Sequence, residues 1–241
     1  MIRIGNGESA SYADPSNDCY VKECSKGVIM DASFWHQRWG QNEIAFHESE
    51  ANPSLVTYFK ELSVTEGSRI FIPLCGKTRD IAWLLSDGYR VAGVELSEIA
   101  VTQLFMELEI EPTITAVGEV NHYSANNIDI FAGDIFHLSR KMLGPVDAIY
   151  DRAALVALPE EMRNRYTAHL MEMSNKAPQL LICYEYDQNV MEGPPFSISN
   201  EEVHQHYRDS YDLTLIGSMN VPDGLKGKCA AIENVWLLQN D

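Results

Sequence analysis

One stretch of about thirty residues, strand–turn–helix–strand in pattern, restricts the possible folds of this chain more than any other. It opens on the short apolar run Arg69–Pro73, which is typical of a buried parallel strand. A tight turn follows, in which Gly76 can adopt backbone angles that other residues avoid. Apolar residues with helical spacing then lead to Gly88, a typical helix end, and Arg90–Glu95 forms a second apolar strand.

This order is half of a nucleotide-binding α/β sheet, in which a ligand lies across the carboxyl ends of the strands. In such sheets the acid that closes the second strand accepts hydrogen bonds from ribose hydroxyls, and Glu95 occupies that position. The alternative is that Glu95 is a surface helix cap ahead of Ser97. Spacing alone favours neither interpretation.

Three nucleoside ligands compete for the turn. A dinucleotide requires G-x-G-x-x-G, of which only Gly76 is present. A nucleoside triphosphate requires G-x-x-x-x-G-K-[ST]; Cys75–Thr78 matches its tail, but Phe71 replaces its leading glycine. Without that glycine the backbone N–H groups cannot readily enclose phosphates, which disfavours a phosphate-loop NTPase. S-adenosylmethionine has no phosphate and fits best.

Five collinear motifs support the last choice: F-W-H-Q-R-W (Phe34–Trp39), P-L-C-G-K-T-R-D-I-A-W-L followed by V-A-G-V-E-L-S-E in the central stretch, G-D-I-F (Gly133–Phe136), Y-D-R-A-A-L (Tyr150–Leu155) and G-P-P-F (Gly193–Phe196). Together they resemble the thiopurine S-methyltransferase family, and its bacterial members most of all. The resemblance runs from about Asp31 to the C-terminus and shows no departure at the motif positions.

The resemblance implies a fold and a reaction. The fold is α/β, that of a class I S-adenosylmethionine-dependent methyltransferase (Rossmann-like), with a seven-stranded, mostly parallel sheet and an antiparallel C-terminal hairpin. We expect that hairpin at Tyr211–Ser218 and Ala231–Leu238. The reaction is methyl transfer from S-adenosyl-L-methionine to the sulfur of small aromatic or heterocyclic thiols, which leaves S-adenosyl-L-homocysteine.

The resemblance also implies roles for individual residues. The cofactor-binding residues are Trp39, Leu74, Gly76, Glu95, Asp134, Ile135 and Arg152, and the substrate-binding residues are Phe34, Phe46, Pro194 and Pro195. The segment around Trp39 is similar to a lid over the cofactor, where an aromatic face would attract the sulfonium. Arg152 orients cofactor or acceptor, and no metal is expected.

Each assignment has a simpler alternative. Trp39 would otherwise pack its helix on the core, and Asp134 would cap a helix over Ile135–Arg140. Asp151 and Arg152 would form a structural ion pair. His47 is interpreted as structural. A dedicated general base is not required, because aromatic heterocyclic thiols are already substantially ionised near neutral pH, and Arg152 would favour the thiolate.

The remaining elements follow from periodicity and caps. We expect helices at Asp31–Trp39, Asn52–Leu62, Glu98–Leu108, Pro159–Met173 and Asn200–Arg208, with Asp31, Asn52 and Asn200 as N-caps. Further strands are expected at Thr113–Val117, Ile128–Ala132, Val146–Tyr150 and Gln179–Tyr184, the first two joined by a polar turn at Ser124–Asn127.

Composition bounds the partners. The chain has 18 basic and 35 acidic residues and a net charge of −17, which argues against nucleic acid and anionic membranes. Five scattered cysteines indicate reduced thiols in a cytoplasmic protein. We expect a flexible leader at residues 1–29 and one domain at 30–241, and the family suggests a monomer.

Two further functions stay open. Bacterial relatives are associated with selenium and tellurium compounds, so a metalloid could be the acceptor in place of a thiol. A cofactor-binding protein that has lost transfer is the non-enzymatic alternative, and the presence of Glu95, Arg152 and the aromatic helix argues against it.

Overall fold

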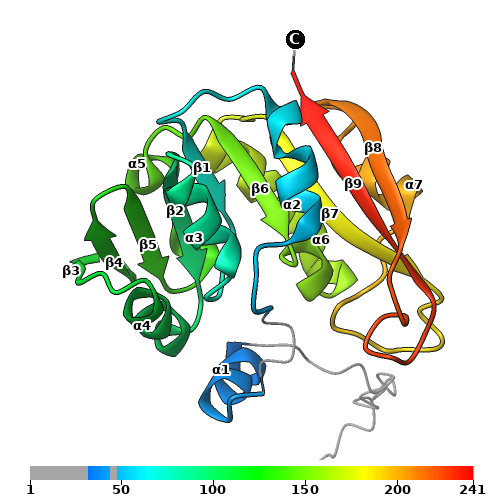
Figure 1. Cartoon of the computed structure of the whole chain (residues 1–241), viewed down its shortest axis with the longest axis horizontal. Coiled ribbons are helices and arrows are strands. Elements are labelled where there is room, and N and C mark those ends of the chain that lie inside the picture. Colours follow the sequence, from blue (N-terminus) through cyan, green and yellow to red (C-terminus); the bar gives the residue numbers. More distant parts are fainter. Residues whose placement is uncertain (1–31, 44–47, 241) are drawn as a thin grey trace, which may run out of the picture.

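A nine-stranded mixed sheet forms the centre of the computed structural model, which describes residues 32–43 and 48–240 (Figure 1). The strand order is β3-β4-β5-β2-β1-β6-β7-β9-β8. The strands are β1 (Arg69–Ile72), β2 (Arg90–Glu95), β3 (Thr113–Val117), β4 (Val120–Ala125), β5 (Ile128–Ala132), β6 (Ala148–Arg152), β7 (Gln179–Tyr186), β8 (Asp212–Asn220) and β9 (Ala231–Gln239). The α-helices are α1 (Ala32–Gly40), α2 (Pro53–Tyr58), α3 (Arg79–Ser86), α4 (Glu98–Glu107), α5 (Arg140–Leu143), α6 (Glu160–Ser174) and α7 (Asn200–Tyr207), with 3-10 turns η1 (Phe59–Leu62), η2 (Ile135–His137) and η3 (Leu155–Ala157).

The predicted fold class is confirmed by the pairing of the strands. β5, β2, β1, β6 and β7 run parallel, and β9 enters antiparallel between β7 and β8 as the predicted C-terminal hairpin. These seven strands make up the sheet that the resemblance implies. Hairpin β3–β4 adds two more at the edge beside β5, of which β3 was predicted as the strand Thr113–Val117 and β4 was not.

The predicted turn at Ser124–Asn127 is wrong in part, because Ser124 lies in the unpredicted strand β4. The chain reverses after Ala125 instead, with Asn127 at φ +64°. Only Val120 and Tyr123 of β4 are buried, so its sequence V-N-H-Y-S-A reads as a polar loop.

Apolar side chains alternate between the two faces of the sheet, and helices cover both faces. One core joins α2, α3 and α4 to strand residues such as Ile70 and Val91. The other joins α6 and α7 to Phe71 and Ala92, the next residues along the same strands. Helices on both faces of a parallel sheet explain why its central strands are continuous apolar runs.

Polar caps explain where two of the helices begin. Asn52 accepts hydrogen bonds from Ser54 N and Leu55 N, so the predicted cap of α2 is confirmed. The predicted cap Asn200 is wrong by one residue, because the Ser199 hydroxyl accepts from Glu202 N. Asp31 lies outside the described residues.

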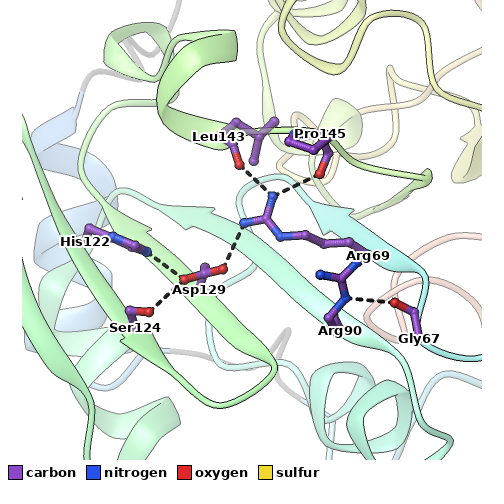
Figure 2. A network of polar contacts seen from close by, with 8 residues as sticks. All are labelled: Gly67, Arg69, Arg90, His122, Ser124, Asp129, Leu143 and Pro145. Atoms are coloured by element: carbon purple, nitrogen blue, oxygen red, sulfur yellow. Dashed lines mark hydrogen bonds and ion pairs between the residues drawn. The ribbon is translucent and has the colours of Figure 1, made fainter.

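A polar network ties the edge hairpin to the amino-terminal end of β1 (Figure 2). Arg69 donates to Asp129 Oδ2 over 3.0 Å and to the Leu143 carbonyl over 2.6 Å. Asp129 Oδ1 lies 2.8 Å from His122 Nε2 and accepts from Ser124 Oγ over 2.9 Å. Burial alone would raise the pKa of Asp129, but these hydrogen bonds hold it below its ordinary value. The network therefore depends on an ionised Asp129.

Candidate cofactor and acceptor site

The carboxyl ends of the parallel strands bring most of the predicted site residues to one edge of the sheet. Leu74 follows β1, Glu95 ends β2, Asp134 follows β5 and Arg152 ends β6. Helix α1, which carries Trp39, lies beyond this same edge (Figure 1). Neighbouring parallel strands end side by side, so the topology itself groups these residues.

The loop after β1 is held in one conformation by backbone contacts. Leu74 and Gly76 have φ values of +46° and +52°, the left-handed region that favours glycine. Cys75 N donates to the Val94 carbonyl over 3.0 Å, and Thr78 Oγ1 accepts from Asp80 N over 3.3 Å as the cap of α3. The turn is therefore fixed both to β2 and to the helix that follows it.

The Lys77 side chain is engaged in an ion pair and does not act as a phosphate-binding lysine. Its Nζ lies 2.6 Å from Glu107 Oε1 at the end of α4, and Arg79 approaches the other Glu107 oxygen at 3.4 Å. A phosphate-loop lysine must face the ligand, so this ion pair argues against a nucleoside triphosphate.

Glu95 is buried, with 6% of its surface exposed. Its Oε2 accepts from Gly76 N and its Oε1 accepts from Ser97 N, each over 2.8 Å. Burial raises the pKa of the Glu95 carboxyl, and these backbone donors oppose that shift. The alternative, a surface helix cap, is therefore wrong because Glu95 is buried, although Glu95 does accept a hydrogen bond from Ser97 N.

Trp39 closes over the same loop. It is the buried residue of α1, and a Cβ on Gly76 would lie 3.2 Å from its Cζ2 atom. Glycine favours this approach, because a Cβ would crowd the indole and the φ of +52° would strain other residues. Trp39, Gly76 and Glu95 thus form one contiguous group, although residues 39 and 95 belong to distant segments.

Cys75 lies within this group. Its side chain is buried, and burial and the Glu95 charge hold the pKa of its thiol well above the ordinary value. Among the described residues Cys75, Cys183 and Cys229 are free thiols.

Asp134 acts as a cap in this structure. Its Oδ1 accepts from Phe136 N over 2.9 Å and opens the short turn η2 rather than a helix to Arg140. Ile135 is buried with 7% exposure, and its carbonyl lies 2.9 Å from His169 Nε2. The capping interpretation and a role beside adenine remain compatible.

Asp151 and Arg152 do not form the alternative ion pair, because neighbouring strand residues point to opposite faces. Asp151 is fully buried and accepts from Tyr166 Oη over 2.6 Å and Leu155 N over 3.2 Å. Burial raises the pKa of Asp151 to about 6.

Arg152 pairs with Glu48, a residue outside every predicted motif. The Arg152 side chain is 10% exposed, and its Nε is buried without a hydrogen-bond partner in the described part of the chain. Burial acts to lower the pKa of Arg152, but Tyr150, Tyr184 and Glu48 hold it above its ordinary value. Arg152 is therefore a permanent cation at the site.

Asp80 joins three elements beneath Arg152. It is 1% exposed and accepts from Asn52 N over 2.7 Å and from Tyr150 Oη over 3.0 Å. It thereby links α3 to the start of α2 and to β6. An acid in a first helical turn is ordinary, so the sequence alone does not indicate this role.

The loop that contains Pro194 and Pro195, which was predicted to face the substrate, is held by two side-chain hydrogen-bond donors. Tyr186 Oη and Lys226 Nζ donate to the carbonyls of Pro195 and Pro194, each over 2.6 Å. Burial, and then Arg38 and Lys228, lower the pKa of Lys226. Both prolines are half-buried.

Helix α1 carries Phe34, and the Arg38 guanidinium lies 4.7 Å from the centre of its ring. Arg38 of α1 lies within electrostatic range of Lys226, which donates to the Pro194 carbonyl. The predicted residues Phe46 and His47 lie outside the described residues.

S-adenosylmethionine fits this donor set. A carboxylate has about four acceptor positions; Glu95 uses two for Gly76 N and Ser97 N, and Leu96 N also acts on it, which leaves acceptor capacity for a ribose hydroxyl. The unpartnered Arg152 Nε is a donor available to an anionic group. The Trp39 indole supplies an aromatic face beside the loop.

Two cavities lie away from this site. A groove of about 430 Å³ between α4 and β3 is lined by residues such as Phe105, Met106 and Ile114, and a second of about 380 Å³ lies near Asp147 and Asn175. Neither is lined by a predicted site residue. Among the described residues, no group of three or more His, Cys, Asp or Glu side chains has a metal-binding arrangement, and no helix has the length and apolarity of a membrane span.

Solved structures of low sequence identity share the fold. One is 1,6-didemethyltoxoflavin-N1-methyltransferase of Burkholderia thailandensis, with a TM-score of 0.60, 15% identity and 87% coverage of both chains. Another is magnesium protoporphyrin IX methyltransferase of Synechocystis, with a TM-score of 0.58, 12% identity and coverage of 87% of this chain and 100% of that one. Both were solved with S-adenosylhomocysteine bound.

Sequence relatives identify the family. Thiopurine S-methyltransferase of Xanthobacter autotrophicus is 54% identical over 211 residues, which cover 87% of this chain and 99% of the relative. That of Teredinibacter turnerae is 52% identical over 212 residues, 88% of this chain and 99% of the relative. The family model for thiopurine S-methyltransferase matches residues 30–239. The chain belongs to the thiopurine S-methyltransferase family.

Proposed function

We propose that this protein transfers a methyl group from S-adenosyl-L-methionine to the sulfur of a small aromatic or heterocyclic thiol, as a thiopurine S-methyltransferase. The observation that carries the proposal is the contact of Trp39 and Glu95 with one loop residue, Gly76. This arrangement supplies acceptors for a ribose and an aromatic face for a sulfonium in one place.

Each cofactor-binding residue has a physical role. Glu95 accepts hydrogen bonds from the ribose hydroxyls, and Leu74 and Gly76 receive the amino-acid end. Asp134 and Ile135 flank the adenine, one as acceptor and one as an apolar wall. Trp39 covers the loop and excludes water from it.

The bound cofactor supplies an activated methyl group, so the protein has to align the acceptor and exclude water. Arg152 stays charged and lies at the end of β6, where it favours the ionised form of an acceptor thiol. No residue needs to remove a proton, because aromatic heterocyclic thiols are largely ionised near neutral pH.

The acceptor lies between aromatic and proline side chains. Pro194 and Pro195, held by Lys226 and Tyr186, form one wall. Phe34 and Phe46 contribute from the N-terminal side. Flat rings pack well against such rigid apolar walls.

The alternatives are less well supported. The ion pair of Lys77 with Glu107 opposes a phosphate-loop NTPase. The relatives named as thiopurine S-methyltransferases favour a thiol over selenium or tellurium compounds as acceptor. We also propose that the protein is a cytoplasmic monomer that acts on small molecules and has no nucleic acid or membrane partner. The net charge of −17 supports the exclusion of anionic partners. We further propose that residues 1–29 are a leader and that residues 30–241 form a single domain.

Thermal unfolding tests cofactor choice, and product analysis tests the reaction. S-adenosylhomocysteine should raise Tm, while Mg-ATP should leave it unchanged, because a ligand stabilises by RT ln(1 + [L]/Kd). When the protein is incubated with methyl-labelled S-adenosylmethionine and mercaptopurine, the label should appear on the sulfur of mercaptopurine. Stabilisation by Mg-ATP alone, or absence of a methylated thiol, would overturn the proposal.

A further inference from the structure

Arg152 lies among more acids than its single charge can balance. Glu48 forms the ion pair with it, and Asp80 also raises its pKa. Glu233 faces the neighbouring Tyr184, whose pKa burial raises to about 12 against the opposing effect of Arg152. The surroundings of this cation are therefore already negative before any ligand arrives.

Two of these acids are engaged elsewhere. Asp80 is held by Asn52 N and Tyr150 Oη, and Glu233 accepts from Ser54 Oγ over 2.5 Å. Glu48 differs from both because its side chain is 46% exposed and its carboxylate contacts the Arg152 guanidinium directly. It is the acid whose charge competes with a ligand for Arg152.

We propose that Glu48 is a specificity-determining residue that makes the acceptor site select thiols without a second negative charge. The inference rests on the proposed function of the same site. Glu48 acts through Arg152: its carboxylate pairs with Nη2 and neutralises the guanidinium towards a carboxylated acceptor, whereas Nε has no partner among the described residues.

The physical reason is charge balance around the Arg152 guanidinium, which is largely buried although Glu48 is half exposed. An acceptor with a carboxylate either displaces Glu48 from Arg152 or lies beside it, and both arrangements leave one negative charge unmatched. Like charges held side by side beside one cation repel each other, which is a common device for rejecting wrong partners. A neutral ring with one thiolate adds a single negative charge, and the positive sulfonium of the methyl donor balances it.

Two acceptors of nearly equal shape test this. Thiosalicylate carries a carboxylate and methyl thiosalicylate does not. Rates with both are measured at saturating S-adenosylmethionine for the wild type, Glu48→Gln and the control Glu50→Gln, which removes the charge of an exposed acid in the same segment. Comparing the ester-to-acid ratio between proteins cancels the difference in intrinsic reactivity.

We expect Glu48→Gln to lower the ester-to-acid ratio of kcat/KM roughly tenfold, through a smaller KM for thiosalicylate. Glu50→Gln should keep the wild-type ratio, and Glu48→Asp should keep most of it. If the wild type turns over only the ester, Glu48→Gln should gain activity on the acid.

An unchanged ratio in Glu48→Gln would overturn the inference. Equal changes for both acceptors with a changed KM for S-adenosylmethionine would also overturn it, because Arg152 would then face the cofactor alone. Turnover of the ester by the wild type upholds thiol methylation whichever way Glu48→Gln behaves, so the two proposals fail separately.

Discussion

The indole of Trp39 lies so close to Gly76 that a Cβ at that position would come within 3.2 Å of the ring. Gly76 in turn donates its N–H to Glu95. Trp39, which precedes the sheet in sequence, and Glu95, which ends β2, are therefore linked through Gly76.

Replacement of Trp39 by alanine should weaken S-adenosylmethionine binding, because the sulfonium loses its aromatic neighbour, and should slow turnover. Loss of an aromatic face beside a cation corresponds to about two- to thirtyfold in affinity. Titration calorimetry measures the affinity, Trp39→Phe should retain most of it, and Gln37→Ala in the same helix should not change it. Equal affinities for Trp39→Ala and the wild type would assign Trp39 to packing alone.

Replacement of Glu95 by glutamine should lower cofactor affinity by about ten- to a hundredfold, because hydrogen bonds to a charged acceptor are the stronger kind. It should also lower the free energy of unfolding by about 1–3 kcal/mol, since one of the Gly76 and Ser97 N–H groups loses its acceptor. Calorimetry and urea unfolding separate the two effects. The control is Glu98→Gln, which changes an exposed acid three positions later and should leave cofactor affinity intact. A similar loss of cofactor affinity in this control would contradict the ribose assignment.

Asp151 should make the protein less stable as pH rises. Its pKa is raised from 3.8 to about 6, so between these values the folded protein binds more protons than the unfolded chain. A shift of this size corresponds to roughly 3 kcal/mol. Asp151→Asn loses this dependence, so its free energy of unfolding relative to the wild type should rise between pH 4 and pH 7.

Urea unfolding at the two pH values measures this difference. The control Asp209→Asn, whose side chain is 95% exposed, should keep a constant offset from the wild type. A constant offset for Asp151→Asn as well would mean that Asp151 is ionised in the folded protein throughout this range.

Asp129 should have the opposite pH dependence. Its pKa is lowered in the folded protein, so its contribution is present above the ordinary value of 3.8 and is lost as pH falls through the folded pKa. Asp129→Asn should therefore be less stable than the wild type at pH 7, and the gap should narrow in acid. A gap that stays constant into acid would show that the network in Figure 2 does not depend on charge.

Much of the fold could be predicted because burial on both faces leaves a clear pattern. The strand Arg90–Glu95 and the ends of Thr113–Val117 were predicted to the residue, as apolar or β-branched runs with turn residues on either side. β4 was missed because its polar outer positions hide a period of two. The C-terminal hairpin was clear from two long runs that flank a Pro/Gly-containing turn.

The site was less predictable than the fold. Motifs indicated Trp39 and Glu95, and the structure brings both against Gly76. Glu48 and Asp80 gave no signal, because an acid in a polar segment or in a first helical turn is ordinary. Their partners come from segments 104 and 28 residues away, and only the folded chain makes such neighbours.

The burial of Cys75 affects how the thiol consumption of this enzyme can be assayed. A thiol attacks disulfides only as a thiolate, and Cys75 and Cys183 are buried with pKa values raised by burial. Neither sulfur should exchange with oxidised acceptor or react with an aromatic disulfide reagent during turnover. Acceptor consumption can therefore be followed colorimetrically without a background from these two positions.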